Sequence, residues 1–157
     1  MESTIDPKGI VKQIFYDALE RITKMLDNPV NGGIESDENV EIQCSYDGLD
    51  NELTITAINP TTGNQVTQYF YEDLYNASLQ TSAIYPDSSD TNSNGTDQVK
   101  INYYLDGNPK TKTDQNGNIN TFSYDSYRRP ITDAVTTLGN NVDGTVRKIA
   151  LNYTMRG

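Results

Sequence analysis

Apolar and polar residues alternate in a recurring register along this chain, and a tyrosine marks each recurrence. Six tyrosines carry the pattern: Tyr16, Tyr46, Tyr71, Tyr103, Tyr124 and Tyr153. Two positions before them stand residues that can be buried: Ile14, Cys44, Tyr69, Ile101, Phe122 and Leu151. The positions between are mostly polar, with Phe15 and Phe70 as exceptions. Alternation with a period of two predicts β-strands that each have one buried face.

Turn-forming sequences separate these strands. Pro, Gly, Asn and Asp gather in "DPKG" (6–9), "NPVNGG" (28–33), "NPTTG" (59–63), "DQNG" (114–117) and "LGNNVDG" (138–144). Such residues supply the dihedral angles and side-chain bonds that reverse a chain. A second turn, of four residues, follows each tyrosine, as at 17–20. The sequence therefore predicts tandem β-hairpins near 10–27, 40–57, 65–82, 97–114 and 118–135, with a partial sixth at 145–157 and a long exposed loop at 85–97.

Residues 10–26, "IVKQIFYDALERITKML", also have the periodicity of a helix and few helix breakers. The other five copies contain turn residues that make a helix implausible, so the match between copies favours strands here too. We therefore predict an all-β fold in which a single array of hairpins, spanning 1–157, forms a curved open sheet. Open edges of such a sheet are templates for other strands, so we also expect self-association or fraying at its ends.

Two copies, "TIDPKGIVKQIFYDALERIT" and "TDQNGNINTFSYDSYRRPIT", resemble the YD-repeat, or Rhs-repeat, family of large bacterial proteins. That family combines a D-P-x-G or D-x-x-G turn, a strand ending in Tyr-Asp, and an A-x-G-R turn. The resemblance runs from Thr4 to Gly157. It marks these residues as the structural signature of the repeats: Tyr16, Asp17, Arg21, Tyr46, Asp47, Tyr71, Tyr103, Tyr124, Asp125, Arg129 and Tyr153.

Several copies depart from the family pattern. The Asp position is occupied by Glu72, Tyr104 and Thr154, and the Arg position by Asn51, Asn76 and Asn108. These departures put in doubt whether each Arg position bonds its neighbouring hairpin in the same way.

The resemblance implies a long sheet that spirals into a hollow shell. In toxin complexes and Rhs effectors such a shell encloses or displays a C-terminal toxin, and teneurins use a related shell in cell-surface adhesion. We therefore expect a structural shell segment of a larger secreted or cell-surface protein, located outside the cell. Its expected partners are neighbouring YD repeats of the same or a parent chain and a polypeptide cargo. The alternative is a cell-surface binding module that recognises carbohydrate or a protein through exposed Tyr and Asn.

Composition narrows the possible partners. The chain has 157 residues, a mean hydropathy of -0.68 and a net charge of -10. Low hydropathy with high charge also fits a disordered chain, but the apolar residues are placed in register. The acidic balance opposes binding to nucleic acid. No apolar stretch is long enough to span a membrane, and the polar start "MESTIDPKGI" does not read as a signal peptide.

The residue types argue against catalysis. The chain has no His, which removes Ser-His and Cys-His pairs and His-based metal sites. Cys44 stands between Ile42 and Tyr46 on the predicted apolar face and reads as a buried structural thiol. Acid pairs leave a two-carboxylate glycosidase open, but most Asp residues stand in turns, which already explains them. We expect no enzyme activity, no catalytic residue, no cofactor and no metal.

Three weaker signals remain open. The segment "DTNSNGTD" (90–97) alternates oxygen-bearing residues before a Gly, as calcium loops do, although no Glu stands at the closing position. Rows of tyrosine rings could stack on sugars, and cross-strand packing is the competing explanation. Asn76, Asn94 and Asn152 lie in N-glycosylation sequons, which carry little weight if the source is bacterial, as the resemblance implies.

Overall fold

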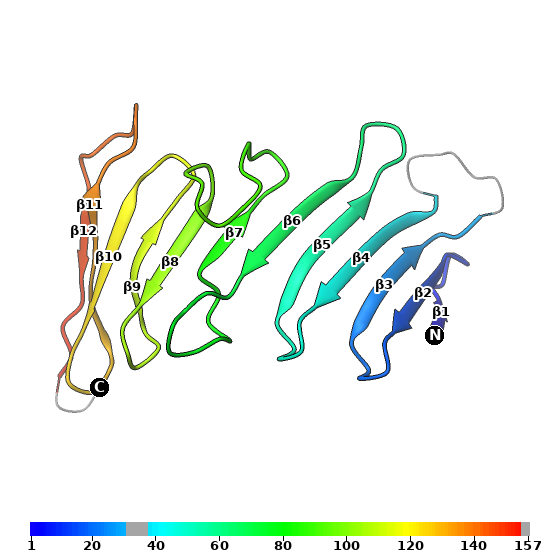
Figure 1. The fold of residues 1–157 in the computed structure, drawn as a ribbon, viewed down its shortest axis with the longest axis horizontal. Coiled ribbons are helices and arrows are strands. Elements are labelled where there is room, and N and C mark those ends of the chain that lie inside the picture. Colours follow the sequence, from blue (N-terminus) through cyan, green and yellow to red (C-terminus); the bar gives the residue numbers. More distant parts are fainter. Residues whose placement is uncertain (31–37, 155–157) are drawn as a thin grey trace. The chain divides into compact units, whose positions relative to one another are not determined.

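The fold is built from β-hairpins alone. The computed structural model describes residues 1–30 and 38–154, which contain twelve strands and no helix (Figure 1). The strands are β1 (Glu2–Ile5), β2 (Val11–Tyr16), β3 (Ile22–Asp27), β4 (Val40–Tyr46), β5 (Glu52–Ile58), β6 (Gln65–Phe70), β7 (Ser82–Ile84), β8 (Val99–Tyr103), β9 (Pro109–Thr113), β10 (Ile119–Tyr124), β11 (Pro130–Thr137) and β12 (Lys148–Ala150). The predicted all-β fold of tandem hairpins is confirmed, and the helical alternative for 10–26 is wrong.

The chain forms two compact halves, Met1–Gln68 and Tyr69–Gly157. In the first half β1 to β6 are paired in chain order, and every pair is antiparallel. In the second half β7 to β12 are paired in the same manner. Among the described residues, β1 pairs with β2 alone and β12 with β11 alone.

The register places the predicted apolar residues on one face. Ile14 stands opposite Met25, Met25 opposite Ile42, and Ile42 opposite Ala57, so these side chains form a row across four strands. Successive side chains of a strand alternate between faces, which leaves Gln13, Glu41 and their neighbours on the other side.

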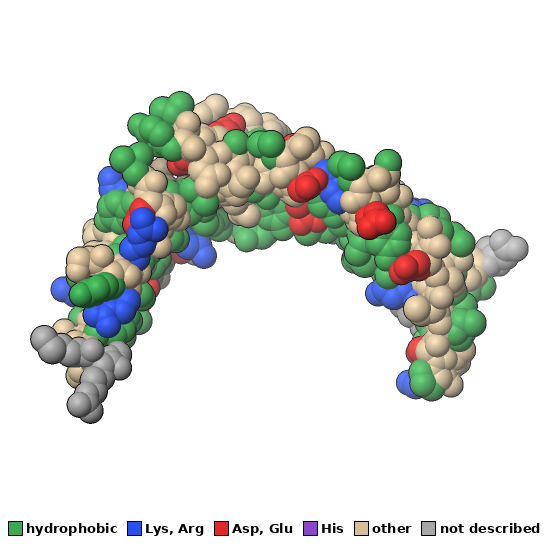
Figure 2. Space-filling model, turned by 90° about the horizontal axis from the view of Figure 1, so that it is seen from below, with side chains coloured by type: hydrophobic (Ala, Val, Ile, Leu, Met, Phe, Trp, Pro, Cys, Tyr) green, Lys and Arg blue, Asp and Glu red, His purple; other side chains and the backbone are tan. Residues whose placement is uncertain are grey.

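The prediction that this face is buried is wrong. The only buried hydrophobic residues of the described chain are Ala83 and Ile84, and its buried polar residues are Asn51, Ser82 and Gln98. Elsewhere the strands are half-buried on both faces or exposed, because each half is a single layer of sheet. Hydrophobic side chains are consequently visible among charged and polar ones in the space-filling view (Figure 2).

A register shift precedes four of the repeat tyrosines. It lies between Phe15 and Tyr16 in the first hairpin and recurs before Tyr46, Tyr103 and Tyr124. A shift of this kind is a β-bulge, which bends the strand and re-aims the side chain beside it. The tyrosines therefore leave the regular ladder just where each hairpin turns.

The third hairpin differs from the predicted pattern. A four-residue turn was expected after Tyr71, but β7 does not begin until Ser82. Its connection contains two further Asx turns, in which Asp73 accepts from the Tyr75 amide (3.0 Å) and Asn76 from the Ser78 amide (3.0 Å). Residues 31–33 of the connection 28–33, and 155–157 of the partial sixth hairpin, lie outside the described residues.

Candidate functional site

A carboxylate closes the turn that follows the repeat tyrosine. In the first hairpin Asp17 Oδ1 accepts hydrogen bonds from the backbone amides of Leu19 (2.8 Å) and Arg21 (3.0 Å). The Asp17 amide in turn donates to the Arg21 carbonyl at 2.9 Å. The same three bonds recur at Asp47 and at Asp125, with the residues two and four positions later. The turn is thus a five-residue unit, one residue longer than predicted.

The same unit closes turns at the opposite ends of the strands. Asp6 Oδ1 accepts from the amides of Lys8 (2.8 Å) and Ile10 (2.9 Å), and Asp114 Oδ1 accepts from those of Asn116 and Asn118 (both 2.9 Å). Sequence reasoning treated the two sets of turns as different. What they share is an Asp at the first position and, three residues later, a residue whose φ is positive.

That fourth position is held in the left-handed region. Gly117 has a φ of 81°, and Glu20, Asp50 and Arg128 adopt 63°, 66° and 64° at the corresponding places. Glycine takes this conformation without strain, whereas other L-residues pay a steric cost there. The carboxylate bonds of the turn offset that cost in the hairpins that lack Gly.

The fifth residue of the turn returns a side-chain bond to the carboxylate. Arg21 Nε donates to Asp17 Oδ2 at 2.7 Å, and Arg129 Nε donates to Asp125 Oδ2 at 2.8 Å. Asn51 replaces the Arg in the second hairpin, and its Nδ2 donates to Asp47 Oδ2 at 2.8 Å. The substitution of Arg by Asn therefore conserves the bond within the turn, a fact that the sequence pattern did not disclose.

In the fourth hairpin the carboxylate has moved. Tyr104 occupies the Asp position and keeps the backbone bond to the Asn108 carbonyl (2.9 Å). Asp106, two residues later, accepts from the Asn108 amide (3.1 Å) and from its Nδ2 (2.9 Å). The Tyr104 ring meets Tyr124 edge to face, with 6.1 Å between the ring centroids. At the position where the other turns have an Asp, this turn therefore has a tyrosine that packs against Tyr124.

The repeat tyrosines bond each hairpin to the strands before it. Tyr46 donates its hydroxyl hydrogen to the Ile22 carbonyl (2.9 Å), and Tyr124 donates to the Pro109 carbonyl (3.0 Å). Tyr153 reaches Pro130 (2.8 Å), Tyr103 reaches Gln80 (2.6 Å), and Tyr16 reaches the Glu2 carboxylate (2.9 Å). For Tyr46, Tyr124 and Tyr153 the acceptor follows the fifth residue of the previous turn. Tyr71 directly follows β6 and is half-buried.

Arg21 adds a second bond between hairpins. Its Nη1 donates to the Asp47 carbonyl and to Asp50 Oδ1, both at 2.9 Å, and its guanidinium lies 4.8 Å from the centre of the Tyr46 ring. One Arg therefore holds its own turn through Asp17 and the next turn through Asp47 and Asp50. This is the contact that the departures from the family pattern had put in doubt, and it is present at Arg21.

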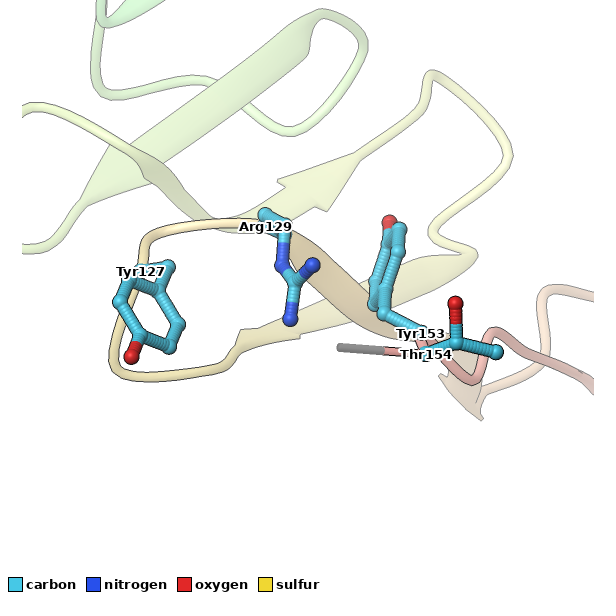
Figure 3. A pocket seen from close by; sticks show the side chains of 4 residues that line it. All are labelled: Tyr127, Arg129, Tyr153 and Thr154. Atoms are coloured by element: carbon cyan, nitrogen blue, oxygen red, sulfur yellow. The ribbon is translucent and has the colours of Figure 1, made fainter. Parts of the chain in front are cut away.

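Arg129 lies in an open pocket. Its guanidinium is 4.2 Å from the centre of the Tyr153 ring and 5.5 Å from that of Tyr127, with Thr154 completing the lining. Figure 3 shows Arg129 between the two tyrosine side chains. A guanidinium binds carboxylate and phosphate groups, and an aromatic ring adds a face on which a ligand can stack. The pocket combines a positive charge with aromatic surface.

The carboxylates of these turns are held in their ionised form. A backbone hydrogen bond from Arg21 is the main cause that lowers the pKa of Asp17 below its ordinary value of 3.8. The Asn51 side chain does the same for the pKa of Asp47. Desolvation raises the pKa of Asp125, but the hydrogen bonds from Arg129 outweigh it and the pKa is lowered.

These shifts predict an acid-sensitive fold. Because the pKa of each turn carboxylate is lower in the folded chain, its stabilisation is complete above the ordinary Asp pKa near 3.8 and is lost as pH falls through the lowered value. Urea unfolding should be measured at pH values from 7 down to 2. The urea concentration at the midpoint should decrease once the pH is below about 4. The Asp47→Asn variant should lose less stability than the wild-type chain over this pH range. A midpoint that does not change between pH 5 and 2 would contradict the assignment.

The tyrosine bonds predict a second set of effects. Tyr46→Phe and Tyr124→Phe should each lower the free energy of unfolding by about 1 kcal/mol, because each leaves a backbone carbonyl without its donor while the ring stays in place. Tyr75→Phe is the matched control, since Tyr75 is 74% exposed. Urea titrations measure all three variants. Equal effects at the three positions would show that the hydroxyl bonds do not join the hairpins.

The loop 85–97 folds around Gln98, which is only 1% exposed. Gln98 Nε2 donates to Asp90 Oδ2 and to the Asn92 carbonyl, both at 3.1 Å, and the Asp97 amide donates to Asp90 Oδ2 at 2.7 Å. The Asp90 carboxylate thus accepts hydrogen bonds from amide groups within and next to the loop. No cluster of three His, Cys, Asp or Glu suited to a metal occurs among the described residues, and most side chains of the loop are exposed.

Cys44 lies in β4 opposite Ile55 and is half-buried, less than predicted. Burial is the main cause that raises the pKa of its thiol, and a neutral thiol is a poor nucleophile.

Within 1–30 and 38–154, no helix has the length and apolar character needed to cross a membrane.

Comparisons with known proteins leave the family open. No protein-family model matches the chain, and no curated protein has a significantly similar sequence. The likeness to YD repeats therefore rests on the quoted residues themselves.

Proposed function

We propose that this chain is part of the wall of a YD-type shell, within a larger secreted or cell-surface protein, and that the shell encloses or presents another polypeptide. The observation that supports it best is the bonding of each hairpin to the strands before it. Tyr46 and Tyr124 use the same hydroxyl-to-carbonyl bond, at 2.9 and 3.0 Å. Because the same bond joins successive copies, further hairpins can be added to the array through the same contact, as a continuous wall requires.

The polar side chains of the turns fit a structural role. Asp17 and Asp125 each accept three hydrogen bonds from their own turns, and Arg21 is shared between two hairpins. Groups with these partners are poorly placed to act as acids, bases or nucleophiles. We therefore assign the chain no catalytic role and propose that it acts as a structural wall.

Limited proteolysis of the full gene product that carries these residues tests the wall. A shell should protect an enclosed polypeptide, which mass spectrometry would detect as a long uncut fragment. The double variant Tyr46→Phe/Tyr124→Phe should loosen the wall and shorten the lifetime of that fragment, whereas Tyr75→Phe should not. A product that is cut throughout under native conditions, with no protected fragment, would reject the proposal.

The Arg129 pocket supports a second candidate, a surface module that binds carbohydrate or a protein. Tyr127 is 79% exposed and lies beside the guanidinium, as an aromatic stacking platform would. A glycan array with the 157-residue chain tests it, with Tyr127→Ala against Tyr75→Ala as the matched pair. Binding that is lost only in Tyr127→Ala would favour the module, and an array without signal would leave the wall as the better function.

A further inference from the structure

Two Asn-Gly sequences lie at the surface of the described chain. Asn94 precedes Gly95 in the loop 85–97, Asn116 precedes Gly117 in the turn after β9, and both Asn residues are exposed. An Asn in this position can react with its own backbone, because the amide nitrogen of the next residue can attack the side-chain carbon Cγ. Glycine has no Cβ to obstruct that approach. Both sequences are suited to the reaction, so the local structure decides which of them reacts.

The turn around Asn116 restrains the reacting nitrogen. The Gly117 amide donates to the Asp114 carbonyl at 3.0 Å, and the Asn116 amide donates to Asp114 Oδ1 at 2.9 Å. Gly139 packs so closely here that a Cβ on it would lie 2.1 Å from the Asn116 carbonyl oxygen. Attack requires the nitrogen to lose its proton and the peptide group to turn toward the side chain. Both steps are opposed, because the proton is hydrogen-bonded and the peptide group is packed.

The loop holds Gly95 less firmly. Its amide donates to the Asn92 carbonyl at 3.4 Å, a distance at which a hydrogen bond is weak. The Asp90 carboxylate lies beside Gly95, and its negative charge opposes loss of the amide proton. That carboxylate already accepts from the Asp97 amide and from Gln98 Nε2, which offsets part of its charge. The weaker hydrogen bond therefore leaves the Gly95 nitrogen freer to react than its counterpart in the turn.

We propose that Asn94 is a site of spontaneous deamidation and that the turn protects Asn116 from the same reaction. The Gly95 nitrogen gives its proton to solvent and forms a bond to Asn94 Cγ, while the bond from Cγ to Nδ2 breaks and the nitrogen leaves as ammonia. Water then opens the succinimide ring. Opening at Cγ gives an aspartate, and opening at the backbone carbon gives an isoaspartate, in which the main chain runs through Cγ. The net change is the addition of one water and the loss of one ammonia.

The modification changes the loop that covers Gln98. An isoaspartate adds one carbon to the main chain, and either product places a new carboxylate in a loop that already contains Asp90 and Asp97. The same loop supplies the Asn92 carbonyl that accepts from Gln98 Nε2 at 3.1 Å. A longer main chain two residues away should disturb this bond and expose Gln98, which is 1% exposed in the native fold. This inference does not depend on the proposed function.

Peptide mapping by mass spectrometry tests the proposal on the whole chain. The folded chain is kept at a mildly alkaline pH, and the conversion of Asn94 and of Asn116 is followed with time. Asn94 should react about fivefold faster or more, which is the rate difference that one ordinary hydrogen bond corresponds to. In guanidinium chloride, where the turn and the loop are lost, the two rates should become similar.

Asp114→Ala provides a second measurement. It removes the carboxylate that holds the Asn116 amide, so it should speed the reaction at Asn116 and leave the rate at Asn94 unchanged. An unchanged rate at Asn116 in this variant would contradict the protection. If Asn116 reacts as fast as Asn94 in the folded chain, or if the ratio of the two rates is the same in guanidinium chloride, the structure does not select the site and the proposal is wrong.

Hydrogen exchange of the separated isoaspartate form tests the effect on the loop. Exchange in β7 and β8 should be faster than in the unmodified chain, because Ala83 and Val99 pair beneath the loop. Equal exchange in the two forms would reject the predicted exposure of Gln98.

Discussion

Asp114→Asn should lower the free energy of unfolding by about 1 kcal/mol, although the two side chains have the same shape. Asp114 Oδ1 accepts from two backbone amides, a role that an Asn oxygen can keep, and Asp114 Oδ2 accepts from Asn118 Nδ2 at 2.7 Å. In the variant an amide group faces the Asn118 amide. Asn118 cannot turn to relieve this, because its Oδ1 accepts from the Gly139 amide at 2.8 Å.

Asp6→Asn is the matched control. Asp6 closes the same kind of turn with Gly9 at the fourth position, but its fifth residue is Ile10, which has no side-chain donor. We expect no measurable change in the urea midpoint there. Asp114→Ala removes all three bonds and should cost about 2 kcal/mol, as removal of a capping side chain does. If Asp6→Asn costs as much as Asp114→Asn, the charge of the carboxylate and not the bond to Asn118 stabilises these turns.

The hairpins were predictable because their determinants are local. Alternation fixes which residues share a face, and Asp or Gly at set positions fixes the turn, so the sequence alone predicts that Ile14 and Ile42 lie on one side of the sheet. The role of Asp17 as a turn residue followed from the same chemistry. The equivalence of Asn51 with Arg21 did not follow, because only geometry shows that both side chains reach the same carboxylate oxygen.

What the sequence missed depends on contacts between segments. Alternation cannot say whether another layer covers an apolar face, and here the row from Ile14 to Ala57 remains half-buried. The long connection after Tyr71 and the loop around Gln98 were also missed. Gln98 is a polar residue without any signal of burial in the sequence, and only the hydrogen bonds that it donates to Asp90 and Asn92 explain why it is among the most buried side chains of the described chain.

The loop around Gln98 gives the second large expected effect. Gly95→Ala should lower the free energy of unfolding by about 2 kcal/mol, as overpacking does. A Cβ at Gly95 would overlap the carboxyl group of Asp90. That carboxyl cannot move freely, because it accepts from the Asp97 amide at 2.7 Å and from Gln98 Nε2 at 3.1 Å. A displaced loop would also expose Gln98, which is 1% exposed in the native fold.

Gly48→Ala separates this effect from the general consequence of replacing Gly. A Cβ at Gly48 meets no atom within 4 Å, and the residue lies outside the left-handed region, so the variant should be unchanged or more stable by about 0.4–1 kcal/mol. Hydrogen exchange locates the effect: Gly95→Ala should speed exchange in β7 and β8, whose Ala83 and Val99 pair beneath the loop, and leave β4 and β5 unaffected. If β7 and β8 exchange at the native rate in Gly95→Ala, the loop is not what protects them, and the burial of Ala83 and Ile84 must come from the strands themselves.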